Sequence, residues 1–226
     1  SPKSSFALAY GLHSRMEKMD VYFVKTQGTG DRSVNKDLGF TRAHHVMLSY
    51  GFKISDNMNM KIEPYFQQLY DVPVIADSSY SVLNRRDFYV ENALVNRGKG
   101  RNIGVDITLE RYLNKGLYYM VTASIFDSKY YGGDRKWRNT LYNRNFIINV
   151  LGGKEWMVGR DKQNMFSVNF KITLQGGDRY APVDEVATLL DPDREVQYDE
   201  TKAFSKQFSP MFITNFSVGY KINRKK

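Results

Sequence analysis

Residues 165–175 of the chain read M-F-S-V-N-F-K-I-T-L-Q, and from Phe166 onward apolar and polar residues alternate. Successive side chains of a β-strand point to opposite faces of the sheet, so this pattern predicts a strand with one apolar and one polar face. About ten residues tilted by about 40° span roughly 25 Å, the height of the apolar band that a membrane β-strand crosses. Strands of soluble proteins usually hold about five or six residues. The length of the stretch therefore favours a strand that contacts lipid.

The same alternation recurs along the rest of the chain. In the clearest case, Ile103, Val105 and Ile107 alternate with a second set of positions that includes Asp106, and no aliphatic residue falls in that second set. Counting every such run predicts about nine antiparallel strands in an all-β, up-and-down meander. The alternating runs are 6–12, 20–23, 46–54, 60–66, 103–109, 117–125, 146–150, 166–174 and 212–222.

The connections between these runs fall into two alternating classes. Residues 14–18, 55–59, 112–116 and 159–164 are short and rich in turn-forming residues, whereas 26–42, 71–101, 127–144 and 176–210 are long. Loops above about 15 residues are uncommon in compact soluble domains, but membrane barrels combine short turns at one end with long loops at the other. A soluble β-sandwich with binding loops is the alternative, since its strands also alternate. Strand length and loop asymmetry favour the membrane barrel.

Composition excludes several other classes. The 226 residues include no cysteine, which excludes disulfides and thiolate chemistry. No run of about 18 apolar residues offers a transmembrane helix, and no signal-peptide pattern follows Ser1. The mean hydropathy of −0.51 suits a barrel with one wetted face and polar loops. The formal net charge of +9 is scattered through turns and loops beside acidic residues, so we expect no nucleic-acid partner.

Several short motifs resemble one known family, the TonB-dependent outer-membrane receptors of the Bacteroidota type. The resemblance is to the C-terminal half of their barrel and runs over nearly the whole chain. Singly each motif is weak, and the resemblance depends on the set taken together. The motifs are Y-G-L-H-S at 10–14, M-E at 16–17, V-Y-F at 21–23, A-H-H at 43–45, Q-L-Y-D-V-P-V at 68–74, L-V-N-R-G at 94–98, T-L-E-R at 108–111, F-D-S-K-Y at 126–130 and G-G-K-E at 152–155.

This resemblance implies a barrel of about 22 strands that encloses an N-terminal plug. Residues 1–226 would be one segment of that barrel, without the plug, the N-terminal strands, the last strands or the segment that binds TonB. It further implies a location in the cell outer membrane of a Gram-negative bacterium and energy-coupled import of a scarce nutrient, such as a siderophore or glycan. Implied partners are outer-membrane lipid, the plug and remaining barrel, the TonB complex and, in this lineage, a surface lipoprotein that acts as a lid.

No motif predicts an enzyme, a cofactor or a metal centre. The chain has no G-x-S-x-G elbow, phosphate-binding loop or H-E-x-x-H sequence. His44 and His45 are neighbours on an expected strand, so their side chains should point to opposite faces. The acidic loop 184–200 could hold a hard cation, but solvated loop charge is the favoured interpretation.

Aromatic residues in two long loops are the candidate ligand-binding residues. Their flat faces and polar tips suit sugars or aromatic chelates, although aromatic girdles at a membrane boundary explain several equally well. An extracellular soluble β-domain that binds carbohydrate or acts as an adhesin is the alternative function. A barrel-type enzyme with a Ser/His or Asp/His pair, using His13 or His45, is a weaker one. The candidate residues are Tyr130, Tyr131, Trp137, Tyr142, Tyr180 and Tyr198.

Overall fold

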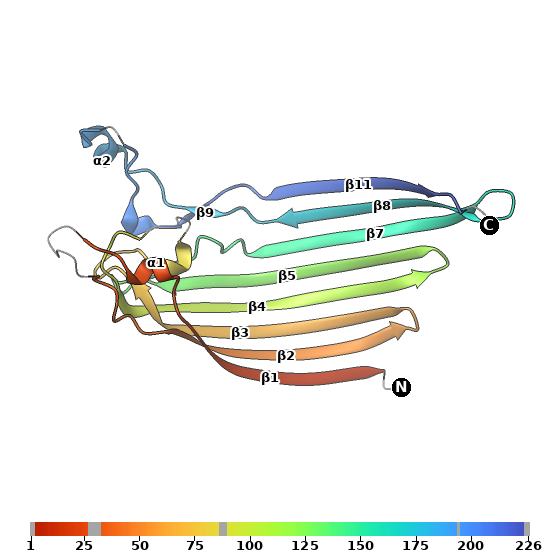
Figure 1. Ribbon diagram of the computed structural model, residues 1–226, viewed down its shortest axis with the longest axis horizontal. Helices are drawn as coiled ribbons and strands as arrows, with labels where there is room; N and C mark the ends of the chain where they lie inside the picture. The colour runs from red at the N-terminus through yellow and green to blue at the C-terminus, as the bar shows by residue number, and fades with distance from the viewer. Residues whose placement is uncertain (1–2, 27–32, 86–89, 194, 224–226) are drawn as a thin grey trace.

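The computed structural model describes residues 3–26, 33–85, 90–193 and 195–223. Eight long strands run side by side, with the short turns at one end and the long loops, including both α-helices, at the other (Figure 1). The long strands hold between 11 and 20 residues each. They are β1 (Ser4–Arg15), β2 (Thr41–Ser55), β3 (Met58–Val74), β4 (Val95–Asn114), β5 (Leu117–Tyr131), β7 (Phe146–Val158), β8 (Asn164–Gln175) and β11 (Met211–Lys221).

Short elements complete the described part of the chain. The sheet has nine strands in the order β1-β2-β3-β4-β5-β7-β8-β11, with β6 pairing with β5, and β9 and β10 form a separate pair. Every pair is antiparallel and the long strands neighbour one another in chain order, which confirms the predicted all-β meander. The short elements are α1 (Met19–Tyr22), η1 (Val82–Asn84), β6 (Trp137–Asn139), β9 (Arg179–Tyr180), α2 (Glu185–Leu190), η2 (Glu200–Lys202) and β10 (Lys206–Gln207).

One predicted strand and one predicted turn are wrong. The run 20–23 lies in and after α1, and residues 14–18 make no turn because β1 continues to Arg15. The run is short, and Val21 and Tyr22 are buried, so packing among the loops decides its structure. Asp20 in the first helical turn suits the positive end of the helix dipole. The ninth strand of the sheet is instead the short β6.

The remaining connections alternate in length as expected. Residues 56–57, 115–116 and 159–163 connect strands at one end, and 16–40, 75–94, 132–145 and 176–210 connect them at the other. The tightest turn joins β4 to β5, where Lys115 (φ 50°) and Gly116 (φ 75°) both have positive φ. Two successive residues of this kind form the type I′ turn, whose twist matches that of an antiparallel hairpin.

The register of the sheet sorts side chains into an apolar and a polar face. One row across the eight long strands contains aliphatic and aromatic residues and a single alanine, while the adjacent row, on the other face, is mostly polar. The apolar row is Phe6, Tyr50, Ile62, Ile107, Ala123, Ile148, Leu174 and Phe212, and the polar row is Ser5, Gly51, Lys61, Thr108, Thr122, Asn149, Thr173 and Ile213.

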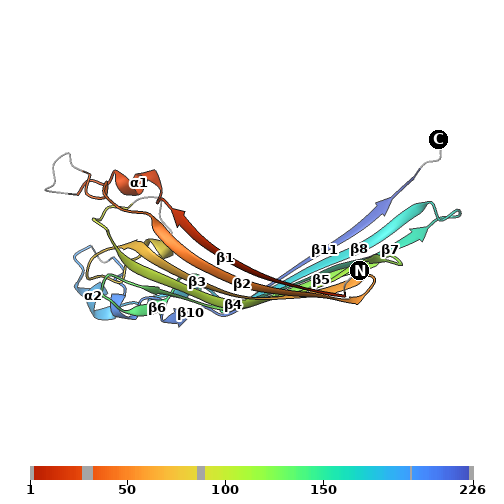
Figure 2. The same cartoon turned by 90° about the horizontal axis from the view of Figure 1, so that it is seen from below.

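The sheet is a single curved layer, and the described residues provide no second layer to cover its apolar face (Figure 2). Phe6 and Phe216 are each 70% exposed, and Ile125 is 58% exposed. The chain exposes 15280 Å², whereas a compact monomer of this mass would expose roughly 10,600 Å². The described residues therefore leave the apolar rows exposed.

The hydrophobic core of the described residues lies at the loop end of the sheet. It joins the loop that contains α1 to the loop after β3, which folds back over the end of the sheet. Gly100 allows this contact, since a Cβ there would lie 2.9 Å from Leu83 Cδ1. The core residues are Val21, Val24, Val72, Val82, Val90 and Leu94.

Replacing Gly116 by alanine should lower the free energy of unfolding by about 2 kcal/mol or more, because alanine is strained at positive φ. A Cβ at this position would also lie 2.2 Å from the carbonyl oxygen of Glu155. Urea unfolding followed by circular dichroism in detergent measures the effect. Gly39→Ala is the matched control, since its nearest atom would lie 3.8 Å away. Equal stabilities of the two variants would contradict this role of the turn.

Candidate functional site

The apolar face forms a band bounded by charged residues at both ends. On β4, the side chains of Ile103, Val105, Ile107 and Leu109 lie on one face between Arg101 and Arg111. The apolar residues from Ile103 to Leu109 span about 20 Å along the strand, whereas the two flanking arginines lie ten residues, or about 33 Å, apart, which is about 25 Å along a barrel axis at a tilt of about 40°. The separation of these two charges is comparable with the apolar band of outer-membrane barrels, which is about 25 Å tall.

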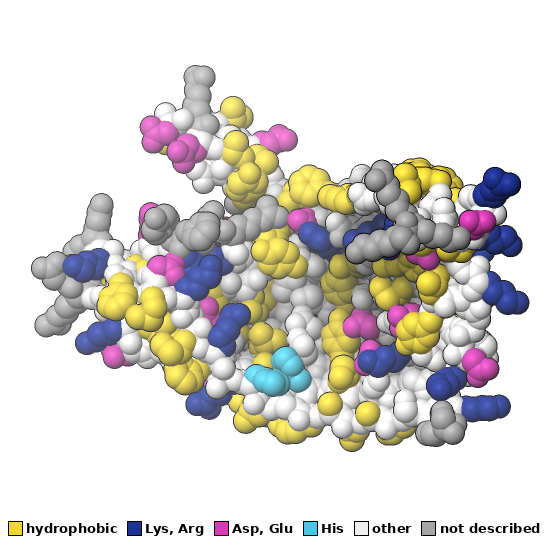
Figure 3. All heavy atoms as spheres, turned by 45° about the vertical axis from the view of Figure 1, so that its right-hand side comes forward, with side chains coloured by type: hydrophobic (Ala, Val, Ile, Leu, Met, Phe, Trp, Pro, Cys, Tyr) yellow, Lys and Arg dark blue, Asp and Glu magenta, His cyan; other side chains and the backbone are white. Residues whose placement is uncertain are grey.

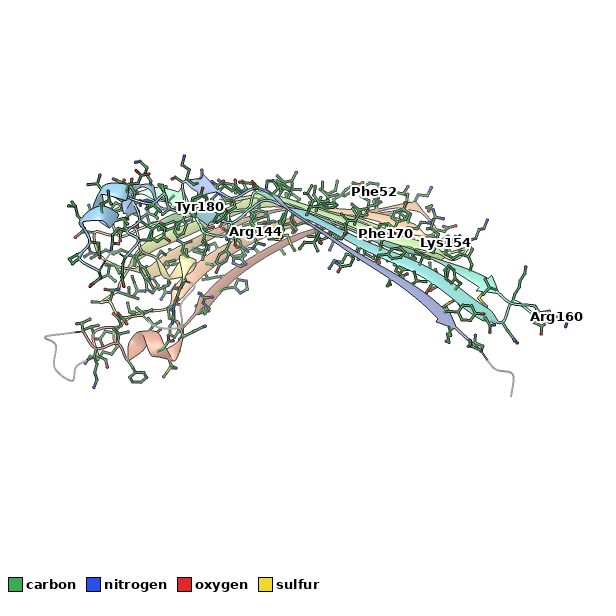
Figure 4. The ribbon with its side chains drawn as sticks, turned by 90° about the horizontal axis from the view of Figure 1, so that it is seen from above. Phe52, Arg144, Lys154, Arg160, Phe170 and Tyr180 are labelled. Atoms are coloured by element: carbon green, nitrogen blue, oxygen red, sulfur yellow. The ribbon has the colours of Figure 1, made fainter. Side chains whose placement is uncertain are left out.

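Aromatic side chains lie at both borders of this band. At the turn end, Trp156 and Phe166 are cross-strand partners with ring centroids 5.7 Å apart, and Tyr220 lies opposite Phe166 on the next strand. At the loop end, Tyr131 and Trp137 are cross-strand partners with centroids 5.5 Å apart. Amphipathic rings concentrate at membrane interfaces because they have both an apolar body and a polar tip. Figure 4 shows Arg160 at the turn tip and Tyr180 at the opposite end.

The opposite, polar face contains an open hollow of about 820 Å³. Its lining comes from β1, β2, β3, β4, β5 and β7, and a hollow that spans six neighbouring strands of one layer forms on the side toward which the sheet curves, so the polar face is the concave one. Histidine and acidic side chains gather among apolar ones on this side (Figure 3). The polar residues that line the hollow are His13, His45, Gln67, Asn102, Asp106, Ser124 and Ser128, with Tyr65, Phe126 and Tyr142 among the aromatic ones.

A chain of hydrogen bonds crosses the floor of the hollow. Asn102 Nδ2 donates to Gln67 Oε1 (2.9 Å), and Ser128 Oγ donates to Asn102 Oδ1 (2.6 Å). Thr140 Oγ1 extends the chain to Ser128 Oγ (2.9 Å). Side chains linked in this way keep fixed orientations, and the hollow presents amide and hydroxyl groups to whatever fills it.

The three histidines divide between the two faces. The rings of His13 and His45 lie 4.6 Å apart on the polar face, where both line the hollow. His44 lies on the other face, where Nδ1 is 2.9 Å from Tyr10 Oη and the ring stacks on Tyr70. The expectation that His44 and His45 point to opposite faces is thus confirmed. Among the described residues no group of three or more histidine, aspartate or glutamate side chains could hold a metal ion.

An ion pair within one loop and hydrogen bonds between loops stabilise the loop end. The Arg138 side chain is 7% exposed and pairs with Asp134, with Nη1 2.8 Å from Oδ1. This hydrogen bond holds the pKa of the Asp134 carboxyl below its ordinary value. The loop after β3 also reaches the longest loop, where Ser78 Oγ donates to Glu200 Oε2 (3.1 Å). The loop end is therefore a packed structure that includes parts of three loops.

The six predicted aromatic residues do not form one cluster. Tyr130 is fully buried and packs against Phe204, with centroids 6.0 Å apart. Tyr131 and Trp137 pair at the border of the apolar face, and Tyr142 lines the hollow. Tyr180 stacks on Phe208 with centroids 4.4 Å apart, and Tyr198 is 58% exposed in the longest loop. Tyr142 is the one of the six that reaches the polar hollow.

The acidic part of the longest loop is organised by its own hydrogen bonds. Asp184 Oδ1 accepts from Ala187 N (2.9 Å) and caps α2, while Asp191 Oδ2 accepts from Gln197 Nε2 (2.7 Å). On α2, Leu189 and Leu190 are 83% and 76% exposed. Sequence reasoning missed this apolar tip, and it named His13 and His45 singly without predicting their contact. A pairing register for β1 and β2 would have shown the pair, since Gly11 lies opposite His45.

Comparisons with protein-family models and with curated protein sequences gave no match to this chain. Among the described residues, no helix has both the length and the apolar character needed to cross a membrane. The assignment of a function therefore depends on the geometry of the two faces and on the loop end.

The Asp134–Arg138 pair predicts a pH dependence of the loop end. Because the folded-state pKa of Asp134 is lowered, its stabilising contribution is complete above the ordinary value of 3.8 and is lost as the pH falls through the lowered pKa. In a Trp156→Phe variant, Trp137 reports on β6, and its emission should stay constant from pH 7 to about pH 4 and shift below. With Asp134→Asn added, that step should disappear. An unchanged step in the double variant would exclude Asp134 as its origin.

Proposed function

We propose that this chain forms part of the wall of an outer-membrane β-barrel of the TonB-dependent receptor type, which imports a scarce nutrient such as a siderophore or a glycan. The observation that carries the proposal is the exposed apolar face of the single-layered sheet. In lipid, all backbone polar groups of a barrel wall are paired between strands, and apolar side chains can remain uncovered by protein.

The dimensions of the sheet support a membrane location. The arginines that bound the apolar band on β4 lie about 25 Å apart at a tilt of about 40°, and aromatic residues flank the band at both borders. The arrangement of the loops also supports this location, since all four long connections lie at one end of the sheet and the short turns at the other. In a bacterial outer membrane that end would face the outside.

The charged residues of the polar face favour the interpretation that this face lines a lumen filled by water or a plug. Glu63, Asp106 and Glu110 project from this face, where Lys61 Nζ lies 2.8 Å from Glu63 Oε1. Charged groups of this kind would be costly against lipid and are stable against water or a polar protein surface. A closed barrel of about 22 strands would leave room for a plug domain supplied by the same protein.

In this proposal, transport requires no covalent chemistry from the chain. The loop end would capture the nutrient, the plug would move under energy supplied through TonB, and the polar face would line the path. Tyr142, His13 and His45 are the residues of the hollow best placed to contact a passing ligand, by hydroxyl and imidazole groups. The exposed leucines of α2 offer an apolar surface to a lid lipoprotein.

The two alternative functions lack such support. A soluble carbohydrate-binding or adhesive sandwich requires a second layer against the apolar face, and the described strands form one layer and a separate two-stranded pair. A barrel-type enzyme requires an activated nucleophile. The His13 ring packs against His45, and no hydrogen bond joins it to a serine or aspartate in the described part of the chain.

The two tryptophans test the membrane proposal, because Trp137 and Trp156 lie at opposite borders of the apolar band. Single-tryptophan variants, Trp156→Phe and Trp137→Phe, would be reconstituted in phosphatidylcholine vesicles. Both tryptophans should be quenched more strongly by lipids brominated near the headgroup than by lipids brominated near the chain ends, since interfacial rings lie at headgroup level.

The control for this experiment is a tryptophan on the polar face. With both native tryptophans replaced by phenylalanine, Tyr142→Trp should show little quenching by either lipid, because position 142 lines the hollow. Absence of quenching at Trp137 and Trp156, or equal quenching at all three positions, would contradict the proposal.

A further inference from the structure

We propose that four cationic side chains at the loop-side border of the apolar face form a belt that binds the phosphate groups of anionic lipid headgroups. The residues are Arg42, Lys99, Arg101 and Lys129, and they are called the cationic belt below. The proposal depends on the membrane location proposed above and adds a lipid class and the residues that select it.

The register places the belt on the apolar face. Arg101 pairs with Lys129, and Ile103 lies two residues from Arg101 on the same face. Lys99 pairs with Tyr131, which in turn pairs with Trp137. On the neighbouring strands, Arg42 pairs with Tyr70, two residues beyond His44 and four beyond Val46. All four cationic residues therefore lie on the apolar face, on the loop side of the last aliphatic residue of their strands.

Aromatic rings hold two of the cationic groups. The guanidinium carbon of Arg101 lies 5.5 Å from the centroid of the Trp137 ring, and Lys99 Nζ lies 5.7 Å from that of Tyr131. Contact with the face of a ring orients a cation without neutralising it. Arg101 Nε is also buried without a hydrogen-bond partner among the described atoms.

The belt carries excess positive charge. Lys129 lies 3.4 Å from Asp127, and this is the belt's one ion pair among the residues that the structure describes. Four cations and one anion leave a net charge of +3 on one patch. Lipid phosphates complement such a patch, because each supplies a negative charge and several acceptor oxygens at a water–hydrocarbon border.

The depth of the belt matches the phosphate layer. Arg101 lies two positions from Ile103, which is about 7 Å along the strand and about 5 Å across the membrane at a tilt of about 40°. The headgroup region on each side of a bilayer is about 5–7 Å thick. Arg101 and Lys129 therefore lie within the headgroup layer, and Arg42 and Lys99 at its outer edge.

Quenching of Trp137 measures the lipid preference directly, since this ring contacts the belt. A Trp156→Phe protein would be reconstituted with brominated phosphatidylglycerol mixed with unlabelled phosphatidylcholine, and with the labels exchanged. The ratio of the two quenching efficiencies gives the preference for the anionic lipid, which we expect to be about fivefold. Replacing all four belt residues by glutamine should reduce it to about one, because the attraction is electrostatic.

The matched control removes the same number of charges elsewhere. Arg15→Gln, Lys53→Gln, Arg160→Gln and Lys171→Gln lie on the polar face or in a turn, and this variant should keep the preference. Quenching of Trp137 by brominated phosphatidylcholine verifies that each variant has inserted and folded. If quenching by this neutral lipid is absent even in the protein with an intact belt, the membrane location itself is wrong.

Three results would overturn the proposal that the belt binds anionic lipid, while leaving the proposed membrane location intact. The first is a ratio of about one in the protein with an intact belt. The second is an unchanged ratio in the belt variant. The third is loss of the preference when inorganic phosphate is added at constant ionic strength, because the belt would then bind free phosphate and not a lipid headgroup. Retention of the preference under that condition supports a lipid ligand.

Discussion

The pairing register of the antiparallel strands is the constraint on which the rest of the structure depends. Because side chains alternate with a period of two, a slip of one residue would move every apolar row to the polar face. Tyrosines packed over glycines on the polar face oppose such a slip. Tyr118 Oη donates to Asn169 Oδ1 (2.8 Å), and a Cβ on Gly153 would lie 2.7 Å from that hydroxyl. Tyr65 covers Gly104 in the same way.

With the register fixed, the two ends of the sheet differ in what stabilises them. Along most of its length the sheet has hydrogen bonds between strands but no buried core among the described residues, and its apolar side chains remain exposed. At the loop end, Val72 and neighbouring apolar residues form a conventional buried core, and Arg138 pairs with Asp134. The loop end can therefore keep a defined shape in water, while in the membrane location that we propose the sheet would lie in lipid.

Most of the sheet could be predicted because its pattern is local. Alternation in 103–109 and 166–174 identifies strands, and the face of each side chain follows from parity alone. The run 20–23 misled the prediction because it is short, and its valine and tyrosine are buried among the loops and not paired in a sheet. Patterns this short cannot separate a strand from one helical turn.

The candidate site was less predictable, because it depends on contacts between distant residues. Tyr130 and Tyr131 are adjacent in sequence, but neighbouring side chains of a strand point to opposite faces. Tyr130 is therefore buried under the loops, whereas Tyr131 lies at the border of the apolar face. The His13–His45 pair and the contact of Arg101 with Trp137 require the pairing register, which no single run contains. Comparison with other proteins could not supply these contacts, so the register of the structure was needed.

Spin labels along β8 test the central claim most directly, because the chain has no cysteine and each substitution creates a single labelling site. Residues 166–173 would be replaced by cysteine one at a time in the protein reconstituted in lipid vesicles. The account predicts a period of two, with collisions with oxygen highest at 166, 168, 170 and 172, and collisions with a water-soluble nickel complex highest at 167, 169, 171 and 173. Low accessibility to both reagents at 166, 168, 170 and 172 would mean a buried core and would contradict a lipid-facing sheet.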